Sequence, residues 1–414
     1  MHVLLRAGLP ALLVLAACGR QAPPISQSDA DFQKNLQLRL IQARSGEVIE
    51  LPAGRWTLNR GLSLNRSDVT LRGAGPERTI LSFKGQVQGA EGILITGASH
   101  VTIADLAIED TKGDGLKANG CKDLVLRSVR VEWTDGPDEK NGSYGLYPVQ
   151  CERVLIEKST VIGASDAGFY VGQSQHIVVR DNQATHNVAG IEIENSTFAD
   201  VYRNDVAHNT GGILVFNLPG LPVKDGRKTR VFDNHIYAND TDNFAPKGNI
   251  VATVPTGTGF MVLANDEIEF FRNKVEDNRT ANVLVLAFTT TGKPANDAQF
   301  DPYPQRIWIH DNQFSGGGDS PDQIEMKALK LAKFGLNGRL PDILWDGAVP
   351  PGTNAAAVQI CLRNNGNGGF ANIDYAGKLA AFSQDVRPHD CELPPLEPVT
   401  WEGLDTGAVG NSGS

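Results

Sequence analysis

The sequence lacks an excess of positive charge and is poor in methionine and aromatic residues. Lys and Arg number 38 against 48 Asp and Glu, which gives a formal net charge of −10; Met occurs 3 times and aromatic residues make up 7% of the chain. A negative chain is not drawn to phosphate backbones or anionic lipid surfaces, so we expect no nucleic-acid partner. Hydrophobic residues, at 41%, suffice for a sizeable core and exclude a disordered chain.

Long apolar segments are also missing. The one long apolar run, residues 9–17, is too short for a transmembrane helix and lies directly before Cys18. Residues 15–19 (Leu-Ala-Ala-Cys-Gly) resemble the bacterial lipobox, which implies an export signal at 1–17, lipidation of Cys18 and a linker at 18–29. The alternative is a simple small-residue cleavage site with an incidental cysteine. We therefore expect an exported lipoprotein, periplasmic or outer-membrane-anchored, that reaches the membrane only through its lipid.

What the chain does contain is a repeat of about 22 residues. Glycines open short runs in which apolar residues alternate, a pattern typical of β-strands. A unit this short cannot bury a face alone, so it must stack on its neighbours. The glycines that open the runs are Gly92, Gly115, Gly145, Gly168, Gly190, Gly212 and Gly259.

Two series of asparagines support the repeat, because both are separated by 22, 30 and 39 residues. Stacked side-chain amides bond to the copies above and below, and asparagine tolerates left-handed turn geometry. We therefore predict two asparagine columns inside a stack of coils, with insertions near 218–228, 241–255 and 289–305 that leave the columns intact. The first series is Asn182, Asn204, Asn234, Asn273 and Asn312, and the second is Asn187, Asn209, Asn239 and Asn278.

The coil length, the glycine-initiated strands and the asparagine columns resemble right-handed parallel β-helix proteins of the pectate-lyase-like superfamily, over about residues 45–320. The segments 211–216 and 243–251 are more similar still to exported bacterial β-helix lipoproteins, a group without an assigned activity. The resemblance implies an all-β fold, a right-handed single-stranded parallel β-helix of about ten coils.

Both ends of the predicted β-helix look capped. Residues 29–44 have the pattern of an amphipathic helix that covers the open edge of the first coil. Residues 322–334 have helical spacing and good helix formers. We expect the β-helix with its N-terminal cap at 30–320, and a helical or irregular C-terminal cap at 321–414.

Four cysteines remain beside Cys18. Cys121 and Cys151 are 30 residues apart, as are Gly115 and Gly145, so they lie at the same point of adjacent coils, where Cα atoms ~4.8 Å apart permit a disulfide. By elimination, the second predicted disulfide joins Cys361 and Cys391. Reduced cysteines buried in the stack are the alternative.

Candidate functional residues lie on the outer face of the strands that follow the glycines, because there they alternate with buried residues. The row changes from polar to apolar along the axis, and aromatic faces flanked by acids and a cation suit a carbohydrate. The candidate catalytic residues are Lys117, Tyr147, Tyr170, Glu192 and Glu194. The candidate substrate-binding residues are Asn119, Asp166 before the Tyr170 strand, and Trp133 and Tyr144 in the acidic insertion 132–144.

Several functions fit this row. In a polysaccharide lyase or epimerase, a base removes the proton beside a uronate carboxylate that a cation neutralises, roles for Lys117 with Tyr147 or Tyr170. In a glycoside hydrolase, Glu192 and Glu194, with Cα atoms ~6.7 Å apart, act as acid and base. A non-enzymatic scaffold uses the same residues to hold a glycan or a partner protein, and alternating glutamates are also a common solubility device. We favour a monomeric lyase or epimerase for an acidic polysaccharide or oligosaccharide, although the row has no arginine.

Signals for a metal are weak, and we expect no cofactor. Residues 110–115 resemble a calcium loop in part, but Lys112 stands where an oxygen ligand belongs. The insertion 132–144 is acidic, which leaves calcium open as an alternative to a solvated loop.

Overall fold

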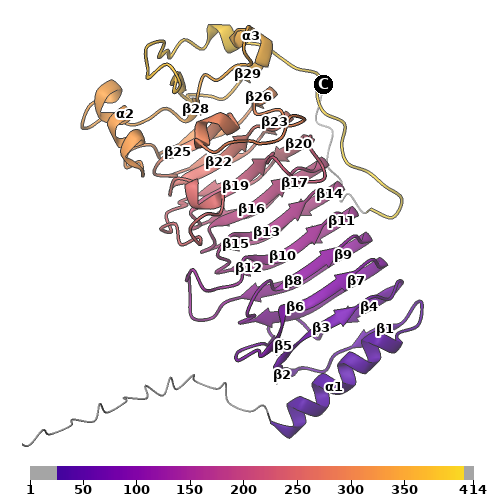
Figure 1. Ribbon diagram of the computed structural model, residues 1–414. Coiled ribbons are helices and arrows are strands. Elements are labelled where there is room, and N and C mark those ends of the chain that lie inside the picture. The colour runs from indigo at the N-terminus through magenta and orange to yellow at the C-terminus, as the bar shows by residue number, and fades with distance from the viewer. Residues whose placement is uncertain (1–25, 405–414) are drawn as a thin grey trace, which may run out of the picture.

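The computed structural model describes residues 26–404, and these form a parallel β-helix that rises from an N-terminal helix to a C-terminal cap (Figure 1). Two parallel sheets run the length of the stack; the smaller, here sheet B, has 11 strands and the larger, sheet A, has 19. Sheet B consists of β3 (Arg60–Leu64), β6 (Gln88–Thr96), β8 (Leu116–Asn119), β10 (Tyr144–Val149), β13 (Ala167–Gly172), β16 (Ala189–Glu194), β19 (Gly211–Phe216), β22 (Thr258–Leu263), β25 (Ala281–Leu286), β28 (Ile343–Trp345) and β30 (Phe370–Asn372).

Sheet A is made of two columns of strands, which β7 (Ser99–Glu109) and β9 (Lys122–Glu132) join because they run through both. The first column also contains β1 (Val48–Glu50), β4 (Val69–Arg72), β11 (Glu152–Glu157), β14 (Gln175–Arg180), β17 (Thr197–Tyr202), β20 (Arg227–Phe232), β23 (Asp266–Phe271), β26 (Gln305–His310) and β29 (Ile360–Arg363). The second contains β2 (Gly54–Thr57), β5 (Thr79–Ser82), β12 (Thr160–Ile162), β15 (Gln183–Thr185), β18 (Asp205–Ala207), β21 (His235–Tyr237), β24 (Lys274–Glu276) and β27 (Gln313–Ser315).

The glycines that open the sheet B strands are required by close packing between coils. A Cβ atom on Gly190 would lie 2.7 Å from the carbonyl oxygen of Gly212, on the next coil. The same atom would lie 3.0 Å from Nδ2 of Asn209, a member of the second asparagine series. The strand starts and the asparagine turns therefore fit together only without a side chain at this position.

Both asparagine columns are confirmed. Nδ2 of Asn182 donates to Oδ1 of Asn204 at 3.0 Å, Asn204 in turn donates to Asn234 at 2.9 Å, and the column continues to Asn365. The second column runs from Asn187 to Asn278 in the same way. The left-handed conformation, however, belongs to the residue before each asparagine in the first column, for example Asp181 with φ 55°. The asparagine itself supplies the side-chain oxygen that accepts the buried turn amides.

The predicted helices at both ends are present. α1 (Gln27–Gln42) begins at the N-cap Ser26 and lies under the first coil with Leu36 and Leu40 buried (Figure 1). At the other end, α2 (Ile324–Phe334) is followed by α3 (Ala355–Val358). The repeat does not stop at residue 320, because β28 and β30 add two strands to sheet B and β29 adds one strand to sheet A. The sequence analysis did not predict these strands, which are three or four residues long.

The disulfide between Cys361 and Cys391 is confirmed, with Cα atoms 4.9 Å apart. The predicted disulfide between Cys121 and Cys151 is wrong, because both are free and buried. Their thiols occupy an inward column that serines continue: the amide of Cys121 donates to Sγ of Cys151 at 3.3 Å, and the amide of Cys151 donates to Oγ of Ser174 at 2.9 Å. Each sulfur therefore acts as a hydrogen-bonding group of the ladder. Cys18 lies outside the described residues.

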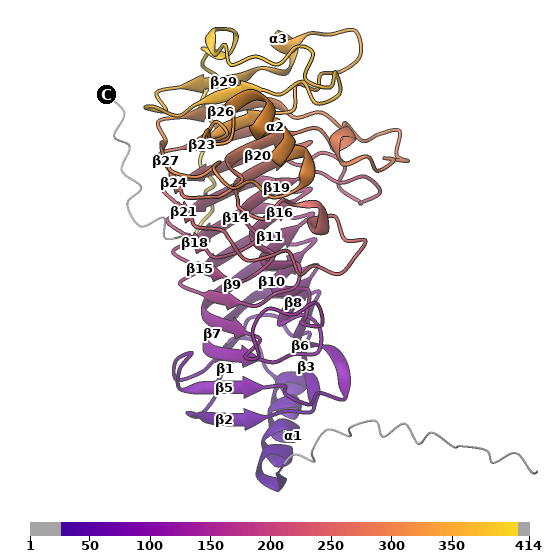
Figure 2. The ribbon, with the colours of Figure 1, turned by 90° about the vertical axis from the view of Figure 1, so that its left-hand side faces the viewer.

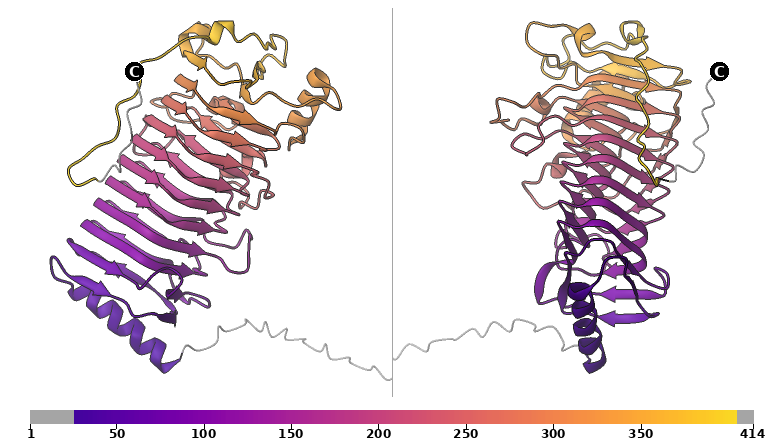
Figure 3. Two further views of the ribbon diagram at one scale, coloured as in Figure 1. Left: turned by 180° about the vertical axis from the view of Figure 1, so that it is seen from behind. Right: turned by 90° about the vertical axis from the view of Figure 1, so that its right-hand side faces the viewer.

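Residues 393–404, at the C-terminal end of the described part of the chain, form an extended strap that crosses the outside of sheet A (Figure 3). Val399 packs there in an apolar cluster with Tyr202, Phe232 and Phe271. Over residues 26–404, no helix combines the length and apolar character that crossing a membrane requires.

Candidate functional site

Six side chains from three adjacent coils meet on the outer face of sheet B, and we call them the acid–tyrosine cluster. Five come from β10, β13 and β16, and the register pairs Tyr170 with Glu192 and Gly172 with Glu194. Asp166 lies in the turn before β13. The cluster consists of Tyr144, Tyr147, Asp166, Tyr170, Glu192 and Glu194.

Three tyrosine rings form one wall of the cluster. The ring centroids of Tyr144 and Tyr147 lie 4.4 Å apart, and the centroid of Tyr170 lies 4.5 Å and 4.9 Å from them, respectively. Tyr144 and Tyr147 are half-buried, whereas Tyr170 is 4% exposed. The first two therefore form an accessible rim, with Tyr170 on the floor below it.

Glycine at position 172 makes the arrangement possible. A Cβ atom there would lie 2.4 Å from the Tyr170 hydroxyl oxygen. Without that atom, the Tyr170 side chain folds back over its own strand, and its hydroxyl donates to Oε1 of Glu194 at 2.5 Å. Gly172 is one of the outward-facing positions that the sequence pattern predicts. Because glycine has no side chain, the sequence did not mark it as a functional residue.

The three carboxyl groups are almost completely buried. Glu192 is 1% exposed, and Glu194 and Asp166 are each 6% exposed, so they are not a solubility device on an exposed strand. Asn249, from the insertion 241–255, donates from Nδ2 to Oδ2 of Asp166 at 2.9 Å. Oε2 of Glu192 has no hydrogen-bond partner in the described part of the chain. A buried carboxyl oxygen without a partner is costly, and such groups concentrate at functional sites.

Burial shifts the protonation of these groups. Removal from water, together with the neighbouring carboxylates, raises the pKa of Asp166 to about 7 and that of Glu192 well above its usual value. Burial also raises the pKa of Glu194 to about 7, although the Tyr170 hydroxyl opposes the shift. Burial raises the pKa of Tyr147 to about 12. Near neutral pH the cluster therefore contains protonated donors beside a carboxyl group that is partly ionised.

Lys117 and Asn119 lie on β8, at the accessible end of the cluster. Nζ of Lys117 lies 4.7 Å from the ring centroid of Tyr147, a cation–π contact. The charge of Lys117 also lowers the pKa of the nearby Asp114, although burial dominates and raises that pKa to about 6. Asn119 is half-buried and pairs with Val149, and it lies three strands from Glu194. Of the two, Lys117 is the one in contact with the cluster.

Trp133 does not face the site, and its predicted role in substrate binding is wrong. Its side chain is buried in the main core, and Nε1 donates to the carbonyl oxygen of Thr111 at 2.8 Å. Gly142 of the insertion 132–144 packs against this ring, since a Cβ atom there would lie 2.6 Å from Cζ2 of Trp133. In the same region, Asp110 accepts hydrogen bonds from the amide and hydroxyl of Thr134. Within residues 26–404, no group of three or more His, Cys, Asp or Glu side chains is placed to hold a metal ion.

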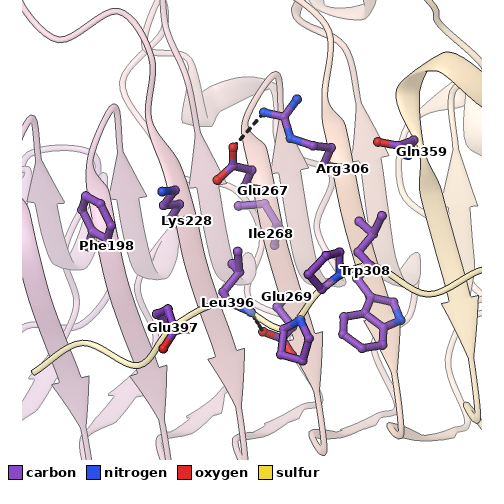
Figure 4. Close-up of a pocket in the computed structure, with 13 residues that line it drawn as sticks. Phe198, Lys228, Glu267, Ile268, Glu269, Arg306, Trp308, Gln359, Leu396 and Glu397 are labelled. Atoms are coloured by element: carbon purple, nitrogen blue, oxygen red, sulfur yellow. Dashed lines mark hydrogen bonds and ion pairs between the residues drawn. The ribbon is translucent and has the colours of Figure 1, made fainter.

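A cavity of about 430 Å³ lies on sheet A beneath the strap (Figure 4). One side is formed by the second residues of successive strands, among them Lys228, Glu267 and Arg306. The other side is the strap, whose Leu396 amide donates to Oε2 of Glu269 at 2.8 Å. Sequence reasoning missed this surface because it followed only the strands that come after the glycines.

Two buried carboxyl groups beside this cavity, those of Asp200 and Glu269, have charged partners. Asp200 pairs with Nη1 of Arg230 at 3.0 Å and accepts from the Val399 amide at 3.2 Å. Glu269 also lies 3.2 Å from Nε2 of His310. These contacts fasten the strap to the stack, although Oδ1 of Asp200 and Nε of Arg230 have no hydrogen-bond partner in the described residues.

Comparisons with known proteins agree with the fold. The model of the right-handed β-helix region matches residues 91–218 and 139–297, which together span half of the chain. The A-module of the Azotobacter vinelandii mannuronan C-5 epimerase AlgE4 is 17% identical, with a TM-score of 0.51; the match covers 84% of this chain and 93% of the module. A mutant form of DFA-IIIase from Arthrobacter chlorophenolicus is 13% identical, with a TM-score of 0.50 over 80% and 91% of the two chains. No curated protein matches the sequence significantly.

Proposed function

The chain belongs to the right-handed β-helix family, and on that premise we propose that it is an exported enzyme that acts on an acidic polysaccharide as a lyase or epimerase. The observation that carries the proposal is the acid–tyrosine cluster, in which three carboxyl groups are buried beside tyrosines and, within residues 26–404, form no ion pair with a lysine or arginine. Stability alone gives no reason for this arrangement, whereas acid–base catalysis requires pKa values near the working pH. The mannuronan C-5 epimerase module has the same fold.

The reaction begins with proton transfer from C5 of a uronate ring. Ionised Glu194, held by the Tyr170 hydroxyl, takes the proton, and the C–H electron pair moves into the carboxylate of the sugar. Lys117 and protonated Glu192 donate to that carboxylate and stabilise its added charge. Tyr170 is then a positioning residue, while Glu194, Glu192 and Lys117 touch the substrate.

The tyrosine rim completes either outcome. In the lyase, the electron pair forms the C4–C5 double bond, the C4–O bond breaks, and the Tyr147 hydroxyl protonates the leaving oxygen. In the epimerase, the same hydroxyl returns a proton to C5 from the opposite face. In both cases the proton on Glu194 passes to water and Tyr147 regains one from water, so the enzyme ends as it began. The raised pKa of Tyr147 keeps it protonated for this role.

A panel of uronate and neutral glycans tests the proposal. A lyase produces absorbance from unsaturated ends, an epimerase incorporates deuterium at C5 in D2O, and a hydrolase produces reducing ends without new absorbance. Glu194→Gln should abolish the product, whereas Glu325→Gln, at an exposed position on α2, should leave it unchanged. Binding without turnover would instead favour a glycan-binding scaffold.

We also propose that the protein is a monomeric lipoprotein anchored through Cys18. The disulfide between Cys361 and Cys391 supports export, because disulfides persist in oxidising compartments. Cys18→Ser should release the protein from membranes into the soluble fraction. If the variant stays with the membranes, the anchor lies elsewhere.

A further inference from the structure

The outward row of sheet B is open on one side of the acid–tyrosine cluster and closed on the other. On β3, β6 and β8 it contains Ser63, which is exposed, and Leu94 and Lys117, which are half-buried. From β16 onward the row is buried: Glu192 is followed by Leu214, Met261, Leu284 and Leu344, of which none is more than 4% exposed. The cluster lies at this boundary.

The insertions close the far side, and they project from the stack beside sheet B (Figure 2). Phe244, Ile250 and Val254 of the insertion 241–255 pack over Leu214 and Met261 in one apolar cluster. Removing these contacts from water stabilises the cover by about 25 cal/mol per Å² of apolar surface. A ligand would have to disrupt this packing to continue along the row.

Polar contacts tie the insertions to one another and to the cap. Lys293, in the third insertion, donates to the carbonyl oxygen of Gly248 at 3.2 Å, and Lys224, in the first, pairs with Asp297 at 2.6 Å. Gln323, directly before α2, donates to the carbonyl oxygen of Thr253 at 2.9 Å. The insertions are therefore bonded to one another and to the C-terminal cap. Together they form a wall over this part of sheet B.

The open side is also bounded laterally. Residues 138–140 of the insertion 132–144 face residues 243–247 across a cavity of about 510 Å³. The accessible part of the row spans the four strands from β3 to β10, about 14 Å at the usual spacing between strands. This length accommodates a short run of sugar rings on one side of the cluster only.

We propose that the site recognises the end of a polysaccharide chain rather than its interior. This inference rests on the proposed function for its substrate class, because a chain that lies along the row must end at the wall beside Asp166 and Asn249. A polymer that ran through the site would need an open surface on both sides of the cluster. The expected action is therefore exolytic, with release or epimerisation of terminal units.

Binding tests the inference independently of turnover. Calorimetry measures which end of the chain the protein requires. The ligand is an oligouronate decamer in four forms: both ends free, the reducing end blocked by a bulky group, the non-reducing end blocked, or both ends blocked. We expect one block to weaken binding at least about tenfold, or about 1.4 kcal/mol, and the other to have little effect. Equal binding of the doubly blocked chain, or no binding of any form, overturns chain-end recognition.

Product analysis distinguishes this inference from the proposed function. End-dependent binding without any product means that the proposed catalysis is wrong while chain-end recognition stands. Products of random length with a rapid fall in viscosity mean that catalysis is right and chain-end recognition wrong. Replacement of residues 244–250 by a Gly/Ser segment of equal length should allow cleavage or epimerisation within the chain as well as at its end. If that variant does not fold, the product pattern of the wild-type protein alone tests chain-end recognition.

Discussion

The two sheets of this β-helix bury the same chemical group in opposite ways. On sheet A, Glu157 and Asp200 are each 4% exposed and each pairs with an arginine, Arg180 at 2.6 Å and Arg230 at 3.0 Å. On sheet B, Glu192 and Glu194 are buried to a similar degree and contact tyrosines and another acid instead. Both sets sit on outward positions of stacked strands, so the fold does not dictate the difference.

The comparison separates structural from functional burial. An ion pair on sheet A compensates in part for removal from water, and the strap amides add hydrogen bonds. On sheet B, burial raises the pKa values of Asp166 and Glu194 to about 7, so these groups keep their protons up to near neutral pH without a cationic side chain beside them in the described residues. On sheet A, burial raises the pKa of Asp200 less, to about 6, because the charge of Arg230 opposes the shift. We infer that the ion pairs of sheet A hold the strap in place. We infer that the protonated carboxyl groups of sheet B serve acid–base catalysis.

The largest expected effect is the loss of activity in Glu194→Gln. Removal of a general base lowers kcat by about 10²–10⁴-fold, while the free energy of unfolding stays equal or rises, because a neutral amide replaces a buried acid. Kinetics on the active uronan and urea denaturation measure the two quantities. If Glu194→Gln loses stability in proportion to activity, the buried carboxyl groups of sheet B have a structural role and not the proposed catalytic one.

Arg230→Ala should have the opposite signature. It leaves the Asp200 carboxylate buried without its arginine, at a cost of about 3–5 kcal/mol in the free energy of unfolding, with kcat unchanged where the protein folds. Arg272→Ala is the matched control, because that arginine pairs with Asp233 at 2.8 Å but its side chain is 43% exposed. The control should cost no more than about 1 kcal/mol. Equal losses in the two variants would argue against a structural role of the buried pair.

Thermal stability should fall as the pH rises from about 4 to about 7. Asp166 and Glu194 have folded-state pKa values of about 7, above their usual 3.8 and 4.5, so the folded state binds more protons in this window. Their contribution is present below pH 4 and is lost as pH passes through 7. Melting temperatures at pH 5 and pH 8 should differ less in Asp166→Asn/Glu194→Gln than in the wild type. An unchanged difference would show that these groups do not titrate as described.

The smallest effect belongs to the cysteine column. Cys151→Ser keeps an acceptor for the Cys121 amide and should change the free energy of unfolding by no more than about 1 kcal/mol. Cys151→Val removes the acceptor and should cost about 1–3 kcal/mol. Thiol titration after unfolding should find both Cys121 and Cys151 reduced. A disulfide between them would contradict the hydrogen-bonded ladder.

The stack could be predicted from the sequence because it repeats. Asn182, Asn204 and Asn234 occupy the same place on successive coils, so equal intervals translate directly into vertical contacts. The same logic placed Cys121 beside Cys151, but an interval cannot tell a thiol that bridges from one that accepts an amide.

The site was predictable only in part. The outward row gave Tyr147, Tyr170, Glu192 and Glu194, and the structure brings these side chains together with Asp166 and Tyr144. The insertion 241–255 adds Asn249 to the cluster, but it follows no period, so nothing in the sequence indicated this contact. The sheet A ion pairs were missed for a related reason, since the strap that covers them lies about 200 residues further along the chain.

The asparagine columns also determine how this architecture tolerates change. The insertions lie between successive asparagines of the columns. Each coil therefore stays hydrogen-bonded to the next, whatever the length of the intervening loop. The loops can therefore change in sequence and length independently of the coils that carry them. If the proposed function is right, exchange of loops between related proteins should change which glycan is bound while the β-helix still folds.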